Sequence, residues 1–77
     1  MPGDILFPRD LYELAARVIA ENKAIGRKVA LAESCTGGLV CAALTEVAGS
    51  SAVLDRGFVT YSNESKQEML GVPSDII

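Results

Sequence analysis

The chain has 77 residues, enough for one small domain, and 7 basic against 10 acidic residues give it a formal net charge of −3. Its basic residues form no run, which argues against a nucleic-acid partner. It contains no histidine, so a Ser-His-Asp triad and histidine-ligated metal sites are excluded within these residues.

Charged side chains interrupt the first 20 residues, so we expect no signal peptide, no membrane-spanning segment and a cytoplasmic protein. The two cysteines, Cys35 and Cys41, are six positions apart and match neither a CxxC redox pair nor a zinc motif. We therefore expect two reduced thiols and no metal site. No cofactor is expected for this chain.

The first predicted helix spans residues 10–24, where apolar side chains recur at helical spacing. Asp10 and Glu13 predict a capping box at its start, and Gly26 predicts its end. Residues 28–32 follow as a short, largely apolar run. Such a run is typical of a strand that is buried on both faces.

Two consecutive glycines then predict the start of a second helix, which residues 48–51 interrupt. The β-rich pieces 52–54 and 58–61 predict one interrupted strand. Between these pieces, Gly57 permits a bulge or bend.

A third short helix is predicted over residues 64–70, with Ser62 or Asn63 as its cap and Gly71 at its end. The alternation of helices and strands predicts a layered α/β sheet that needs more strands than these. The chain stops just after Ser74, which is a candidate cap for another helix. We therefore expect a domain that is cut in its middle.

The turn from Glu33 to Gly38 joins a strand to a helix and is the first candidate site. Unpaired backbone N–H groups and the positive end of a helix dipole meet there, which favours anions. The hydroxyls of Ser34 and Thr36 add donors, and Gly37 with Gly38 allows a ligand to approach the backbone. The alternative is that these hydroxyls only cap the helix.

Lys66 is the second candidate. One helical turn away in either direction it meets no acidic side chain. Such a lysine can act as the general base that a serine needs when no histidine is present. Alternatively, its stem covers Met69 and Leu70 while its ammonium group lies in water.

Polar residues also mark the end of the second strand, where Tyr61 and Asn63 precede Lys66. Ligands bind at strand ends in α/β sheets, although Asn63 is also explained as a helix cap. Glu33 has two possible roles, since it could orient Ser34 or accept bonds from backbone donors.

Several ordered blocks of the sequence resemble the CinA C-terminal domain family. They are the LAESCTGGL block at residues 31–39, the GFVTYSN block at 57–63, Lys66, and the MLGV block at 69–72. The resemblance covers nearly everything from residue 10 onward.

This resemblance implies a three-layer α/β/α sandwich with a mixed, mostly parallel sheet. It also implies a nicotinamide-nucleotide amidase that converts nicotinamide mononucleotide and water to nicotinate mononucleotide and ammonia without a metal. Because the family domain continues for about as long again, we expect residues 1–77 to be the N-terminal half of one such domain. The chain begins with Met1, which resembles the stand-alone amidases.

Carried over by motif, Ser34 would be the nucleophile, Lys66 the base, and Tyr61 would orient the pair or the substrate. Thr36, Gly37 and Gly38 would hold the nucleotide phosphate or the amide oxyanion. Glu33 and Asn63 are the further candidates for substrate contact. The implied partner is a small nucleotide, and we expect the complete domain to form a homo-oligomer.

Two other interpretations remain open at this stage. The chain could be a non-catalytic nucleotide- or phosphate-binding module that uses the same glycine turn. It could also be an inert fragment that lacks the second half of the site.

Overall fold

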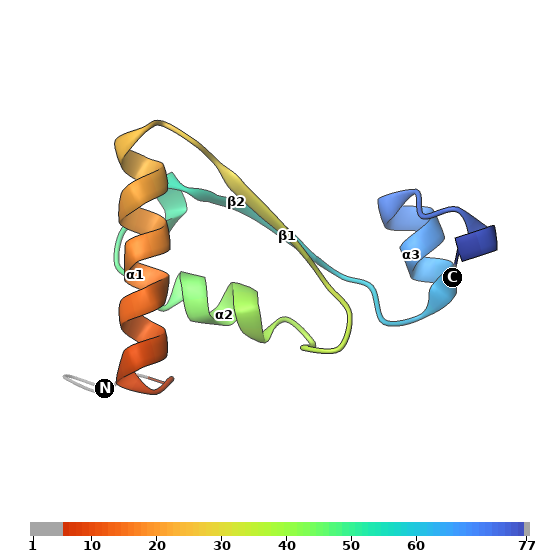
Figure 1. The fold of residues 1–77 in the computed structure, drawn as a ribbon, viewed down its shortest axis with the longest axis horizontal. Helices are drawn as coiled ribbons and strands as arrows, with labels where there is room; N and C mark the ends of the chain where they lie inside the picture. Colours follow the sequence, from red (N-terminus) through yellow and green to blue (C-terminus); the bar gives the residue numbers. More distant parts are fainter. Residues whose placement is uncertain (1–5, 77) are drawn as a thin grey trace.

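The structure is a computed structural model that describes residues 6–76. Helices and strands alternate along the chain, as the sequence predicts (Figure 1). The α/β class with a parallel sheet is therefore confirmed. The elements are α1 (Arg9–Ala24), β1 (Val29–Glu33), α2 (Leu39–Thr45), β2 (Leu54–Val59) and α3 (Asn63–Leu70), with short 3-10 turns η1 (Ser50–Ala52) and η2 (Ser74–Ile76).

Helix α1 begins one residue earlier than predicted, and its predicted capping box is wrong. Pro8 occupies the cap position, and its carbonyl oxygen accepts the bond from the Tyr12 N–H at 3.0 Å. Asp10 thus lies inside the first turn, where its carboxylate accepts from the N–H of Leu11 and caps nothing else. The helix ends before Gly26, whose φ of 68° lies in the left-handed region that favours glycine.

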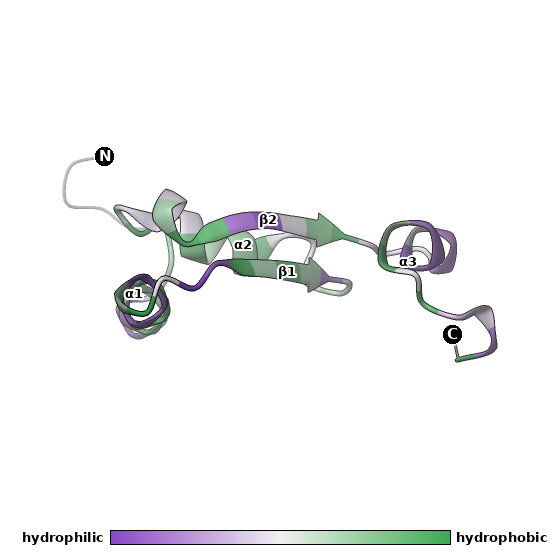
Figure 2. Cartoon of the chain, turned by 90° about the horizontal axis from the view of Figure 1, so that it is seen from above, coloured by the Kyte–Doolittle hydropathy of each residue, from purple (hydrophilic) through white to green (hydrophobic). Residues whose placement is uncertain are grey.

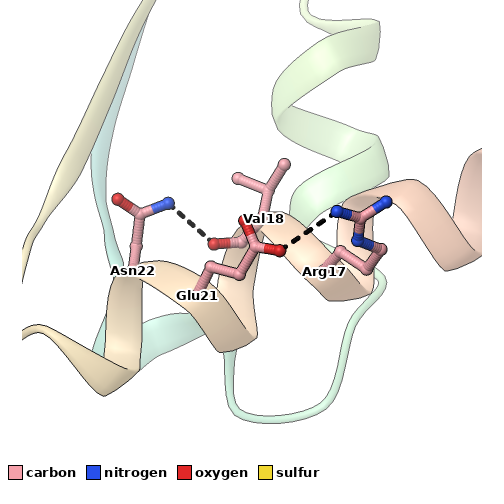
Figure 3. Close-up of polar contacts among 4 residues, drawn as sticks. All are labelled: Arg17, Val18, Glu21 and Asn22. Atoms are coloured by element: carbon pink, nitrogen blue, oxygen red, sulfur yellow. Dashed lines mark hydrogen bonds and ion pairs between the residues drawn. The ribbon is translucent and has the colours of Figure 1, made fainter.

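The outer face of α1 is polar and makes only local contacts. Arg17 and Glu21 form an exposed ion pair at 3.2 Å, one helical turn apart (Figure 3). On the side that faces the core, half-buried Asn22 donates from its side chain to the carbonyl oxygen of Val18 at 2.8 Å. Exposed pairs of this kind contribute little to stability, so the opposite face must hold α1 in place.

That opposite face packs against α2 and against residues on either side of η1 in a small core. Ala15 and Ile19 are buried as the predicted apolar stripe requires, while Leu14 on the same stripe is 55% exposed. Helix α2 ends at Thr45, slightly before the predicted break. The buried members of the core cluster are Ala15, Ile19, Leu44, Val47 and Val53.

Strands β1 and β2 pair in parallel, with α2 as the crossover between them. The register places Leu31 opposite Gly57 and Glu33 opposite Val59. One more bond extends the pair, because the N–H of Thr60 donates to the carbonyl oxygen of Glu33 at 2.8 Å. Both strands therefore end together, at the edge of the sheet that lies away from α1 (Figure 1).

The predicted interruption of the second strand is one irregular residue inside the predicted joint 55–57, and it lies at Asp55 and not at Gly57. Residues 54–59 form one strand, and the irregularity lies at Asp55, because Val29 pairs with Leu54 and Ala30 pairs with Arg56. The strand also starts later than predicted, since Ala52 belongs to η1.

Gly57 does not bend the strand; it leaves space for a side chain of α2. A Cβ atom at this position would lie 2.1 Å from the sulfur of Cys41 on α2. Glycine therefore allows α2 to lie directly against the sheet, which a local reading of the sequence could not show.

Burial of β1 on both faces was predicted and is wrong for the described residues. Along the strand, Val29, Leu31 and Glu33 are partly or fully buried, whereas Ala30 and Ala32 are exposed. The reason is that no helix within residues 6–76 covers the second face, which Figure 2 views from above. This alternation is typical of a sheet covered on one side.

Helix α3 agrees closely with the sequence prediction. Ser62 caps it, accepting from the N–H of Ser65 at 3.1 Å, and Gly71 ends it with a φ of 70°. The N–H of Val72 returns to the carbonyl oxygen of Lys66 at 3.2 Å, which closes the last turn. None of its residues is buried, and it stands apart from α1 and α2 in both views.

The contact between Gly57 and Cys41 gives a test of the packing of α2. Gly57→Ala should destabilise the protein by about 1 to 3 kcal/mol, because the added methyl group overlaps the Cys41 sulfur. In a Cys41→Ala background the same change should cost much less, since the remaining Cβ atom lies at 3.6 Å. Urea unfolding of the four proteins measures this coupling. Equal costs in the two backgrounds would contradict the contact.

Candidate active site

The carboxyl ends of β1 and β2 bring the two candidate segments to one edge of the sheet. The loop 34–38 follows β1, and residues 60–62 follow β2. Because the strands are parallel, both segments leave the sheet at the same edge, opposite the end where α1 lies (Figure 1). This edge is where α/β sheets bind ligands.

Glu33 is the most constrained polar side chain at this edge. It is the last residue of β1 and only 5% exposed. The hydroxyl of Thr36 donates to its Oε1 at 2.6 Å, and the N–H of Val40 donates to the same oxygen at 3.0 Å. The N–H of Cys41 donates to Oε2 at 2.9 Å. The side chain of the last residue of β1 therefore caps α2, the helix that follows.

These bonds keep the Glu33 carboxylate ionised. The Thr36 hydroxyl is the largest cause that lowers its pKa, to about 2, and the N–H groups of Cys41 and Val40 add to the effect. Burial acts in the opposite direction and is outweighed. Near the start of α2 the negative charge also faces the positive end of the helix dipole.

The sequence left two roles open for Glu33, and the structure shows that it accepts bonds from backbone donors. The alternative in which Ser34 and Thr36 cap the helix does not hold, because the N-cap residue Gly38 has no side-chain cap and Glu33 supplies the oxygens. The Thr36 hydroxyl donates to the Glu33 carboxylate that caps α2. Contacts of Thr36 and Glu33 with a substrate stay predictions. Sequence reasoning missed the N–H groups of Val40 and Cys41 as partners.

The glycines of the loop have backbone conformations that other residues rarely adopt. Gly37 has a φ of 64° and Gly38 a φ of 97°. A Cβ atom on Gly38 would lie 3.5 Å from a methyl group of Val59, so the start of α2 is close to the end of β2. Within the described residues, no hydrogen bond uses the backbone N–H groups of residues 35–38.

Ser34 and Lys66 lie on separate elements at this edge. Ser34 is half-buried and directly follows Glu33, while Lys66 is half-buried on α3. No hydrogen bond within residues 6–76 joins the two side chains, so their pairing stays a prediction. Tyr61 is 77% exposed between β2 and α3, and Asn63 is the exposed first residue of α3.

The two thiols are free but have different environments. Cys35 is exposed in the loop, and Cys41 is half-buried where α2 meets Gly57. Burial raises the pKa of Cys41, and the neighbouring Glu33 carboxylate raises it further. The structure thus makes Cys41 a packing residue.

Two broader features complete the description of residues 6–76. No helix among them is long and apolar enough to cross a membrane. No group of three or more potential metal-ligating side chains gathers there.

The lowered pKa of Glu33 gives a pH-dependent stability. A group with a lowered folded pKa contributes stability above its unfolded value of 4.5 and loses it as the pH falls toward about 2. We expect the stability difference between the wild type and Glu33→Gln to be full above pH 5 and to shrink through this window. Urea midpoints at several pH values measure it, with exposed Glu13→Gln as control. A difference that does not change with pH would contradict the bonding.

The cysteines should differ in reactivity. Cys35 should react with iodoacetamide at least about ten times faster than Cys41, because only thiolates that reagents can reach are alkylated readily. Mass spectrometry of peptides after short exposures measures both rates, and Cys35→Ser confirms the assignment. Equal rates would show that α2 does not shield Cys41.

Comparison with known proteins places this chain in a family. The model of the CinA C-terminal domain matches residues 11–77. The chain is 60% identical over 62 residues to the nicotinamide-nucleotide amidohydrolase PncC of Enterobacter agglomerans, covering 80% of this chain and 38% of the relative. Against PncC of Escherichia coli K12 the identity is 50% over 68 residues, covering 88% and 41%.

A solved structure agrees with these sequences. The competence/damage inducible protein CihA of Agrobacterium tumefaciens superposes with a TM-score of 0.91 at 58% identity, covering 94% of this chain and 44% of that one. The chain therefore spans about two fifths of the length of the relatives that it matches. On these grounds, the chain belongs to the CinA C-terminal domain family.

Proposed function

We propose that this chain, in a domain of the length of its relatives, supplies the nucleophile and the base for hydrolysis of nicotinamide mononucleotide. The products would be nicotinate mononucleotide and ammonia. Two relatives that are 60% and 50% identical carry the name nicotinamide-nucleotide amidohydrolase, which supports this substrate class. Because the chain spans only part of those proteins, the activity is proposed for the whole protein.

One observation carries the proposal. The parallel β1–α2–β2 unit delivers the Ser34 loop and the segment leading to Lys66 to the same edge of the sheet. The backbone N–H groups of residues 35–38 are unpaired within the described chain, so they can receive an oxyanion. A hydroxyl nucleophile and oxyanion donors on one loop are what acyl transfer requires.

In this reaction, the Ser34 oxygen attacks the carboxamide carbon while the Lys66 amine accepts the hydroxyl proton. The carbon–nitrogen bond then breaks, and the proton passes from Lys66 to the departing ammonia. Lys66 then takes a proton from water, whose oxygen attacks the resulting ester, and returns this proton to the Ser34 oxygen as the ester bond breaks. The carboxylic acid that leaves loses its own proton to solvent and becomes the carboxylate. The N–H groups of the loop stabilise the negative oxygen in both steps.

The remaining roles follow from position. Tyr61 lies between β2 and α3, and Asn63 is the first residue of α3, the helix that carries Lys66. Both side chains are exposed, which suits contacts with the substrate. The N–H groups of Val40 and Cys41 are already bound to Glu33, so the loop supplies the oxyanion donors.

The cytoplasmic location and the homo-oligomer are also part of this proposal. A phosphorylated nucleotide does not cross membranes freely, which favours an enzyme inside the cell. The surface between α1 and α2 has an apolar hollow, lined by Leu11, Leu14 and Val40 among others, which suits burial against another surface.

The test is ammonia release from nicotinamide mononucleotide by the protein at its natural length, with a chelator present. Ser34→Ala and Lys66→Ala should each reduce turnover by at least about a thousandfold, because each removes an essential member of the dyad. Matched controls are Ser51→Ala and Lys23→Ala, which change exposed residues on η1 and α1. Circular dichroism checks that every variant is folded.

Three results would overturn the dyad or the activity. Full turnover in Ser34→Ala or Lys66→Ala would exclude the dyad. Calorimetric binding of the nucleotide without any product would instead indicate a non-catalytic binding module. If the protein shows no binding and no turnover, the chain is inert in this reaction.

A further inference from the structure

Glu33 has contacts that the proposed hydrolysis does not use. We propose that Glu33 is a positioning residue, whose carboxylate fixes the Ser34 loop to the start of α2. The proposal rests on the proposed function for its consequence, which is catalysis by Ser34. Its structural part can be measured separately.

The three bonds of the carboxylate reach two parts of the turn. One goes to the side chain of Thr36 in the middle of the loop, and the others go to the N–H groups of Val40 and Cys41 on α2. Glu33 itself is fixed in the sheet, where its carbonyl oxygen accepts from the N–H of Thr60. The carboxylate thus ties strand, loop and helix together.

The loop needs such a tie because its own residues provide little rigidity. Gly37 and Gly38 carry no side chains, and glycine has the widest choice of backbone conformations. No side chain within residues 6–76 bonds to the backbone of residues 34–38, so the bond from the Thr36 hydroxyl to Glu33 is the side-chain restraint on the loop there. Ser34 lies one peptide bond from Glu33, so a fixed Glu33 and a fixed Thr36 hold the nucleophile from both sides.

Glu33 cannot serve as the acid or base itself. It is nearly fully buried, and both of its oxygens already accept hydrogen bonds. It therefore acts through Ser34 and through the N–H groups of residues 35–38. Catalytic groups that move by about 1 Å can lose on the order of a hundredfold in rate, so this restraint matters for turnover.

The kinetic test uses variants of both partners in the protein at its natural length. Glu33→Gln should lower kcat for nicotinamide mononucleotide by about a hundredfold, and Thr36→Val by about tenfold, with KM within about threefold of wild type. Thr36→Ser keeps the hydroxyl and should recover most of the loss. The shape of the pH–rate profile should not change, and Glu13→Gln on α1 is the matched control.

Three kinetic outcomes overturn the proposal. A raised KM with unchanged kcat would make Glu33 or Thr36 a direct substrate contact. A limb of the pH–rate profile that disappears in Glu33→Gln would make Glu33 an acid or base. Wild-type rates in both variants would show that the restraint has no effect on catalysis.

A second measurement needs no substrate and also covers a variant that folds poorly. Thr36→Val leaves the carboxylate on the N–H groups of α2, so the fold should persist while the loop loosens. Backbone NMR order parameters of Gly37 and Gly38 should then fall below those of wild type and of Thr36→Ser. Unchanged order parameters would overturn the positioning role. If the loop loosens but even the wild type releases no ammonia, the proposed function fails and the restraint of the loop stands.

Discussion

The rest of the structure depends on one buried charge. The Glu33 carboxylate is removed from water, and among residues 6–76 it forms no ion pair with a cation. Such a charge is tolerated only when its oxygens are fully hydrogen-bonded. The bonds come from Thr36 and from the first turn of α2, so β1 cannot keep its last residue buried unless α2 starts in this place. The same bonds satisfy backbone donors that a short helix with glycine at its N-cap would otherwise leave unpaired.

The same arrangement requires α2 to lie close to the sheet. Gly57 leaves room for the sulfur of Cys41, and Gly38 brings the start of the helix against Val59. Small residues at these contacts let the helix backbone lie near the strands, and a core poor in aromatic residues suits this arrangement. The loop of Ser34 is therefore fixed relative to the end of β2.

The two members of the proposed dyad have unequal structural support. Ser34 follows a strand whose last residue is bonded on several sides, and its loop is tied to α2. Lys66 belongs to α3, which is capped by Ser62 and Gly71 but buries none of its residues within the described chain. The apolar core lies at the other end of the molecule, beside α1. Stability and the candidate chemistry thus occupy opposite ends of the same unit.

The sequence by itself determined the features whose signals are local. Helical spacing placed α1 and α3 to within a residue or so, Ser62 and Gly71 marked the ends of α3, and the glycines after Glu33 marked the turn from strand to helix. A buried carboxylate shows no such signal, because its partners Val40 and Cys41 are distinguished only by their position in space. Only the tertiary structure could decide that Gly57 makes room for Cys41, that the irregular residue is Asp55, and that one face of β1 is exposed. Each of these depends on which distant segment packs against the residue, and neighbouring residues in the sequence carry no record of that.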